Sequence, residues 1–193
     1  MIKMYNKSNA PDRCAPGDFF VKKEPTLNPQ WFGDSFDIVK RFFIENLNSI
    51  GYQVVVDHTI LTGKWNGLEH DFYTFLKAYP PNGIISAKSA LMLDPDTGIG
   101  KKNSKKHVTI KYIADQLLRY DVVFSFDQSF PRGANAKDTI IEKLLLLQET
   151  GNYVFYYNSH ARFLFAAKSI DILGEIEQQL LASGLPASRL LKV

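Results

Sequence analysis

Apolar residues recur every three or four positions in five segments of the chain, which is the spacing that buries one face of a helix. The clearest example follows Asp34 and Ser35, both good N-cap residues, and ends before Gly51, which suits a helix C-terminus. Its apolar face carries Phe36, Val39, Phe43, Leu47 and Ile50. The pattern predicts helices near residues 34–50, 68–79, 109–120, 136–150 and 169–183.

Short apolar runs typical of strands lie between these helices, at residues 52–56, 89–93, 121–126, 153–158 and 162–167. The first three alternate with helices, which favours βαβ units and a parallel sheet. Ser159-His160-Ala161 separates the last two, which favours a hairpin. We therefore expect a three-layer, Rossmann-like α/β domain with a mostly parallel sheet and an antiparallel C-terminal hairpin. The aromatic residues of the hairpin are expected to pack in the core and at the sheet edge: Tyr156, Tyr157, Phe163 and Phe165.

Residues 1–32 are the least patterned part of the chain, and prolines interrupt them at positions 11, 16, 25 and 29. We interpret them as an irregular arm that packs on the domain or on a partner subunit, as in a homo-oligomer. Residues 33–193 then form the α/β domain.

Composition narrows the class of protein. The chain has 193 residues, is 45% hydrophobic and carries a net charge of +3, which is too small to identify a nucleic-acid partner. Its single cysteine, Cys14, excludes an internal disulfide framework. No apolar run approaches ~18 residues, and the N-terminus lacks the apolar core of a signal peptide. We expect a cytoplasmic protein without a membrane partner.

The most informative stretch is Ser89–Gly98, in which a fully apolar strand runs into Asp94-Pro95-Asp96-Thr97-Gly98. Pro95 cannot donate to a strand ladder, so the strand should end at Asp94. Ligands of open α/β sheets bind beyond the carboxyl ends of strands, which places Asp94 and Asp96 at the mouth of a site. The alternative is an acidic turn that only caps the next segment.

Asp57 and Asp127 also follow predicted strands. If the three strands are neighbours in parallel register, Asp57, Asp94 and Asp127 face one crevice. Such a group can hold Mg²⁺, orient a ribose or accept a hydrogen bond from a base amine. Aspartates are also common in the turns after strands, so coincidence remains the alternative.

A basic loop follows Gly98 and should lie at the same edge of the sheet. Its lysines, with Arg132 nearby, are candidates for contacts with phosphates of a nucleotide or nucleic acid: Lys101, Lys102, Lys105 and Lys106. A solvated loop without a ligand is the alternative. The four histidines show no metal-ligand spacing, and the chain has neither a Walker loop nor a Gly-x-Ser-x-Gly motif.

Three stretches suggest a family. Gly33-Asp34-Ser35-Phe36-Asp37-Ile38-Val39-Lys40-Arg41 resembles the Gly-Asn-x-x-Asp-Val-x-Lys-His signature of the large-subunit rRNA adenine methyltransferases, and residues 54–63 stand where these enzymes carry an Asp-x-His-Ala-Gly-x-Gly loop. Asp94-Pro95-Asp96-Thr97 occupies the place of their Asp-Pro-Pro-Tyr motif. The chain is also similar, over about residues 31–168, to uncharacterised bacterial and phage proteins with a Gly-Asp-x-x-Asp-x-x-Lys opening, an Asp-Pro-Asp-Asn/Thr-Gly motif and a terminal Arg-Phe-x-Phe strand.

The resemblance implies a class I, S-adenosylmethionine-dependent methyltransferase that acts on a nucleic-acid amine. It implies that Asp94 accepts a hydrogen bond from the target amine and that Lys40 lies beside the cofactor. The cofactor-binding residues that it implies are Gly33, Asp37, Asp57 and Gly63.

Two other functions remain open from the residues. Asp96, which replaces the second proline of the methyltransferase motif, favours a phosphoryl hydrolase or nuclease in which Asp94, Asp96 and Asp127 bind Mg²⁺. The sparse glycines of the loop at residues 57–63 favour a non-catalytic descendant that binds a nucleotide or a protein.

Overall fold

The computed structural model describes residues 29–57, 65, 67–81, 87–102, 104 and 106–193. Five helices are present in this part of the chain: α1 (Ser35–Ser49), α2 (Glu69–Leu76), α3 (Ile110–Leu117), α4 (Ala136–Gln148) and α5 (Ile170–Ala182). Short 3₁₀ turns, η1 (Pro29–Trp31) and η3 (Ala187–Arg189), lie near the two ends of the described chain. Each predicted helix is confirmed, and polar side chains cap four of them as the sequence suggests: Asp34, Thr109, Asn135 and Ser169.

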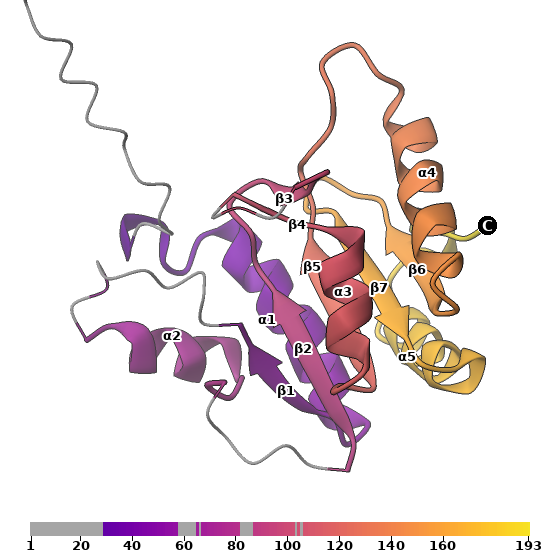
Figure 1. Cartoon of the computed structure of the whole chain (residues 1–193). Coiled ribbons are helices and arrows are strands. Elements are labelled where there is room, and N and C mark those ends of the chain that lie inside the picture. Colours follow the sequence, from indigo (N-terminus) through magenta and orange to yellow (C-terminus); the bar gives the residue numbers. More distant parts are fainter. Residues whose placement is uncertain (1–28, 58–64, 66, 82–86, 103, 105) are drawn as a thin grey trace, which may run out of the picture.

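Six strands form the main sheet, in the order β1-β2-β5-β7-β6-β8. Their bounds are β1 (Gln53–Val56), β2 (Ser89–Leu93), β5 (Val122–Phe126), β6 (Tyr153–Tyr157), β7 (Phe163–Ala167) and β8 (Leu190–Leu191). A small separate ladder joins β3 (Gly98–Ile99) to β4 (His107–Val108) just beyond the carboxyl end of β2. Figure 1 shows β3 and β4 at the upper edge of the sheet.

The sheet is mixed rather than mostly parallel, which corrects the prediction. β1, β2 and β5 pair in parallel, whereas β5–β7, β7–β6 and β6–β8 pair antiparallel. The reason is that the second strand of the predicted hairpin, β7, joins β5, so the hairpin extends the sheet instead of only closing its edge. The short strand β8 then pairs with β6.

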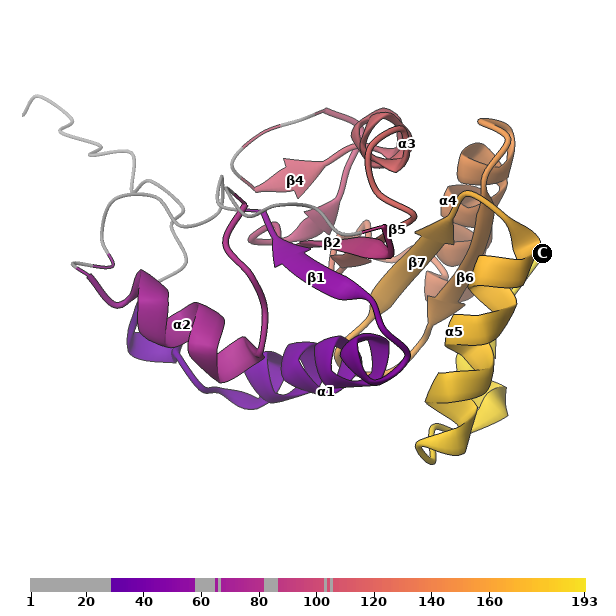
Figure 2. The same cartoon turned by 90° about the horizontal axis from the view of Figure 1, so that it is seen from below.

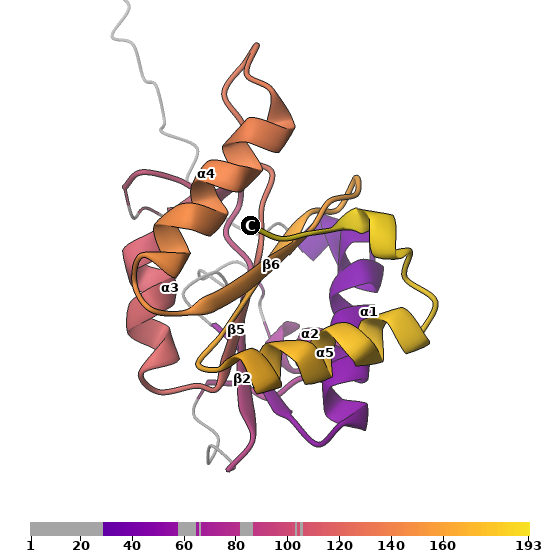
Figure 3. The ribbon, with the colours of Figure 1, turned by 90° about the vertical axis from the view of Figure 1, so that its right-hand side faces the viewer.

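Helices cover both faces of this sheet, as the three-layer prediction requires. α1, α2 and α5 lie on one face and α3 and α4 on the other (Figures 2 and 3). The alternation of side chains along each strand divides the core accordingly. Val54, Met92 and Phe165 pack on the α1 side, whereas Val55 and Leu91 pack on the α3 side.

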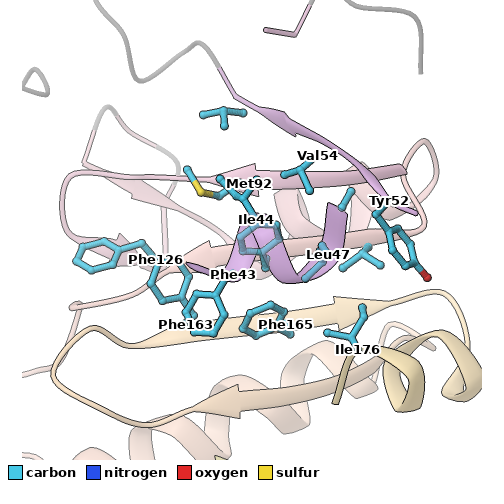
Figure 4. Close-up of a cluster of buried hydrophobic side chains, with 14 of the residues drawn as sticks. Phe43, Ile44, Leu47, Tyr52, Val54, Met92, Phe126, Phe163, Phe165 and Ile176 are labelled. Atoms are coloured by element: carbon cyan, nitrogen blue, oxygen red, sulfur yellow. The ribbon is translucent and has the colours of Figure 1, made fainter. Parts of the chain in front are cut away.

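Aromatic residues dominate the α1 side of the core. Phe43 of α1 contacts the rings of Phe163 and Phe165, with centroids 4.9 and 5.1 Å apart (Figure 4). The predicted core role of the hairpin aromatics is confirmed, since Tyr156, Phe163 and Phe165 are fully buried. No helix in the described ranges combines the length and apolar character needed to cross a membrane.

Candidate active site

A cavity of about 430 Å³ lies where α1 begins beside the carboxyl end of β2. It is on the face of the sheet that α1 and α2 cover. Six aromatic residues line it, and its polar groups come chiefly from the start of α1 and from the segment after β2. The lining residues are Trp31, Phe32, Asp34, Phe36, Asp37, Lys40, Trp65, Phe72, Asp94, Pro95, Asp96, Thr97, Phe126 and Gln128.

A buried ion triad forms the polar part of this cavity. The Lys40 Nζ atom donates to Asp94 Oδ2 at 2.6 Å and to Asp37 Oδ1 at 2.9 Å. All three side chains are at most 7% exposed. The structure thus brings together Asp94, Lys40 and Asp37, three residues that the family resemblance implied for one site.

Local sequence explains how the triad is built. Asp34 caps α1 by accepting from the backbone N–H groups of Phe36 and Asp37, which fixes where the helix starts. Asp37 and Lys40 then stand three residues apart and share a face of the helix. Gly33, with φ of 80°, donates its N–H to Asp37 Oδ2 at 2.9 Å, so both oxygens of Asp37 are held.

The charges of the triad shift its pKa values. Burial disfavours the ammonium form of Lys40, but the carboxylates of Asp94 and Asp37 outweigh that penalty and raise the pKa of Lys40. The pKa of Asp94 is raised as well, mainly by burial and further by the negative charges of Asp37 and Asp34, while Lys40 opposes the shift. One cation therefore serves two buried carboxyl groups.

One oxygen of Asp94 remains available. Lys40 bonds Oδ2, and Oδ1 receives no hydrogen bond from the part of the chain that the structure describes. Four aspartates and one lysine line the cavity, so its electrostatic potential favours a cation or a hydrogen-bond donor over an anion.

Aromatic rings supply the rest of the wall. Phe32 makes edge contacts with Trp65 and Phe72, at centroid distances of 6.2 and 6.0 Å, and Phe36 contacts Phe126 at 5.3 Å. The indole N–H of Trp65 is buried and has no acceptor among the described residues. A buried donor without an acceptor is costly, which makes Trp65 a candidate contact for a ligand.

The three strand-end aspartates do not share one crevice. The three strands are neighbours in parallel register, which was the condition for a shared crevice. Asp57 nevertheless bonds the Tyr112 hydroxyl at 2.8 Å and Asp127 bonds Lys143 Nζ at 2.6 Å, both on the α3–α4 side. Val56 pairs with Met92 and Leu93 pairs with Ser125, so Asp94 is level with Phe126. Because successive side chains alternate between faces, Asp94 points to the α1 side, away from the other two aspartates.

This arrangement separates the residues predicted to hold Mg²⁺. Asp94 and Asp96 belong to the cavity, whereas Asp127 lies across the sheet with both oxygens engaged, by Ile99 N at 2.9 Å and by Lys143. The described residues include no cluster of three or more His, Cys, Asp or Glu side chains placed to hold a metal ion.

The other predicted site residues are distributed over the molecule. Asp96 lines the cavity and is exposed, and Gly33 contacts the triad through Asp37. Asp57 is on the opposite face, so the structure does not bring it to the triad. Gly63 and Lys105 lie outside the described residues.

The basic residues also fall outside this cavity. Lys101 and Lys102 line a separate groove between α3 and α4. Lys106 and Arg132 line neither that groove nor the cavity.

Sequence reasoning missed the aromatic wall. Trp31 and Phe32 fell within the segment interpreted as an unpatterned arm, and Trp65 belongs to no predicted element. The available signal was the pair of aromatic residues directly before Gly33, in a segment otherwise rich in proline and polar residues.

Comparison of the chain with protein-family models, with curated proteins and with solved structures finds no match.

Proposed function

We propose that the chain is a divergent, Rossmann-like S-adenosylmethionine-dependent methyltransferase that acts on a nucleic-acid amine. The observation that carries the proposal is the acidic, aromatic cavity in which Asp94 keeps one oxygen free beside the Lys40–Asp37 pair. The resemblance of the motifs that contain Gly33, Lys40 and Asp94 to those of adenine methyltransferases points to the same chemistry.

The cavity suits this cofactor in charge and in shape. S-adenosylmethionine, when bound, supplies an electrophilic methyl group on a positively charged sulfur, together with an aromatic adenine ring. Aromatic faces attract cations, and the surplus of carboxyl groups in the cavity adds to that attraction. The same charges repel a phosphate group, which argues against an unassisted phosphate site here.

Asp94 has the central role in the proposed reaction. Its free oxygen would accept a hydrogen bond from the target amine and would stabilise the positive charge that develops on the nitrogen as the methyl group leaves the sulfur and bonds to the nitrogen. The proton that the methylated nitrogen must then lose would pass to solvent water. Lys40 is a positioning residue that fixes the Asp94 carboxyl group through the 2.6 Å bond. Asp37 in turn fixes Lys40.

The Mg²⁺-dependent alternative gains no support from the site, because Lys40 already neutralises Asp94 and Asp127 lies on the other face. The non-catalytic alternative predicts that a ligand or partner binds without turnover, and the experiment below separates it from methyl transfer.

The test uses the two tryptophans of the chain, Trp31 and Trp65, because both line the cavity. S-adenosylmethionine added at ~100 times its dissociation constant stabilises the fold by ~2.7 kcal/mol and raises the melting midpoint by roughly 5–10 °C. We expect that shift together with a change in tryptophan fluorescence. Asp94→Asn should weaken methyl transfer to adenine-containing oligonucleotides, whereas Asp138→Asn, an exposed change on α4, should not.

Absence of any shift at millimolar S-adenosylmethionine would refute the proposal. A shift without methyl transfer to any nucleic acid would support the binding-only alternative. A shift with Mg²⁺ alone would redirect the search to phosphoryl chemistry.

A further inference from the structure

A groove of about 870 Å³ lies between α3 and α4, on the face of the sheet opposite the candidate active site. Figure 3 shows these two helices together on one side of the sheet. The groove is lined by Ile99, Gly100, Lys101, Lys102, Ser104, His107, Thr109, Ile110, Lys111, Ser129, Phe130, Pro131, Thr139, Glu142, Lys143 and Leu146.

The wall of the groove is largely apolar. Ile99, Ile110 and Phe130 belong to the hydrophobic cluster on this side of the sheet, and Leu146 adds a half-exposed apolar face from α4. Such a wall favours a ring or another apolar body over water.

Positive charge gathers along the same groove. Four lysines line it against one acid, Glu142. Lys143 is bonded to Asp127 and Lys111 to Asp115, but Lys101 and Lys102 are exposed and make no ion pair within the described ranges. The ammonium groups of Lys101 and Lys102, which have no ion-pair partner among the described residues, therefore lie at the edge of the apolar groove.

The loop that carries these lysines is folded against the groove rather than simply solvated. Ser104 Oγ accepts from the backbone N–H groups of Lys106 and His107, both at 3.1 Å. Gly100 packs against the His107 ring so closely that a Cβ atom there would lie 2.7 Å from it. Gly100 and Ser104, which stand before and after the two lysines in the chain, are thus both held by contacts with His107.

Neutral donors complete the anion-attracting surface. α3 begins at this groove, and Thr109 Oγ1 caps the N–H of Tyr112, which leaves the N–H groups of Ile110 and Lys111 without a partner in the described chain. Unpaired N–H groups at a helix start attract phosphate. The Ser129 hydroxyl, also in the wall, makes no hydrogen bond to the described residues.

We infer that this groove is a binding site for a nucleotide phosphate, with the base or sugar against the apolar wall and the phosphate at Lys101, Lys102 and the start of α3. A free nucleotide and a nucleotide within a strand present the same phosphate chemistry. The inference goes beyond methyl transfer and does not depend on it, because the groove and the acidic cavity lie on opposite faces of the sheet.

Titration calorimetry with adenosine monophosphate, pyrophosphate and a single-stranded oligodeoxynucleotide tests the site. The test variant is the double substitution K101E/K102E, which changes only exposed side chains. We expect it to weaken binding at least about tenfold. It should also reduce the slope of log Kd against log salt concentration by roughly one to two. Binding of the monophosphate identifies a free nucleotide as ligand, and binding of the oligonucleotide alone identifies a strand.

The matched control is K77E/K137E, which changes the net charge equally at two exposed lysines that do not line the groove. It should bind like the unmodified protein, and S-adenosylmethionine binding should be the same in both double variants. Failure of all three probes to bind at millimolar concentration would overturn the inference. Equal weakening of binding in the two double variants would also overturn the inference, because that result would show that only the net charge of the protein attracts the ligand.

Discussion

Lys40 is the residue on which the candidate active site depends most. Its ammonium group lies 2.6 Å from Asp94 and 2.9 Å from Asp37, and all three side chains are at most 7% exposed. Buried charges are tolerated only when they are paired, and here one cation balances two potential anions. Removing Lys40 therefore affects two carboxyl groups at once.

We expect Lys40→Ala to lower the free energy of unfolding by about 3–5 kcal/mol, because it leaves buried carboxyl groups uncompensated. Asp94→Asn should cost less, since Lys40 keeps its bond to Asp37. Urea unfolding followed by circular dichroism measures both effects. Lys111→Ala is the matched control, because it breaks an exposed Lys–Asp pair and should change stability by less than about 0.5 kcal/mol. A Lys40→Ala loss as small as that of the control would show that the triad is not a buried ion cluster.

At the scale of elements, the segment between β2 and β3 connects the two sides of the molecule. It runs from Asp94 in the acidic cavity to Gly98, which lies directly against Asp127 at the end of β5. Gln128 N donates to Thr97 O at 2.9 Å, and Ile99 N donates to Asp127 Oδ1 at 2.9 Å. The segment can lie this close to β5 only because residue 98 has no side chain.

Gly98→Ala should therefore be strongly destabilising, by about 3 kcal/mol or more. Gly98 has φ of 119°, and an added Cβ atom would lie 2.6 Å from Asp127 Cα and 2.7 Å from Gln128 N, both backbone atoms. Gly133→Ala is the control, since Gly133 has φ of 78° but nothing within 4 Å of the added atom. The control should lose only the stability that a left-handed backbone conformation costs a residue with a side chain, about 1–2 kcal/mol. Equal losses of stability in the two variants would contradict the close packing.

The helices and the five longer strands could be predicted from the sequence because local signals mark them, whereas the two-residue strands β3, β4 and β8 were not predicted. Asp34 and Asn135 cap the helices that they precede, and Pro95 follows the end of β2 as the pattern requires. The mixed sheet could not be predicted, because local pattern identifies the hairpin but not which of its strands joins β5. That choice depends on packing between distant segments.

The site was only partly predictable for a related reason. The motifs placed Lys40, Asp37 and Asp94 together, whereas a strand-end rule placed Asp57 and Asp127 with them. Side chains alternate between the two faces along a strand, so the face to which an aspartate points depends on its position in that alternation. The register between strands then decides which residues of neighbouring strands point to the same face. The register puts Asp94 level with Phe126, one residue before Asp127, and so sends the two carboxyl groups to opposite faces.

At the scale of the whole molecule, the single sheet separates two spaces of opposite electrostatic character. The acidic cavity lies under α1 and α2, and the basic groove lies between α3 and α4. Both open near the carboxyl ends of β2 and β5, where Figure 1 shows the β3–β4 ladder. A cationic ligand and an anionic ligand can therefore bind to the same edge of the domain without competing for one pocket.

Buried and half-buried tyrosines on both faces make the stability of the whole fold sensitive to alkaline pH. Burial raises the pKa of Tyr73 to about 12. The pKa values of Tyr112 and Tyr156 are raised further, mainly by burial and then by the charge of a neighbouring carboxylate. That carboxylate is Asp57 for Tyr112 and Asp127 for Tyr156. In the unfolded chain these hydroxyls ionise near pH 10. Above that pH the unfolded state binds fewer protons than the folded state, so stability falls as pH rises.

We therefore expect tyrosine ionisation to leave the free energy of unfolding unchanged below about pH 10. Above that pH it should lower the free energy of unfolding steadily. Tyr156 is fully buried and donates to Asp127 Oδ2 at 2.9 Å, so its share can be isolated. Tyr156→Phe should cost about 1–3 kcal/mol at pH 8, because Asp127 loses a buried donor, but should reduce the alkaline slope by about 1.4 kcal/mol per pH unit. Urea unfolding at intervals between pH 8 and about pH 11.5 measures both quantities. Tyr153→Phe, at an exposed position on the same strand, is the control for the substitution itself and should change stability at pH 8 by less than about 0.5 kcal/mol. Parallel pH profiles for Tyr156→Phe and the unmodified protein would show that Tyr156 does not retain its proton in the folded state, whereas converging profiles would confirm that it does.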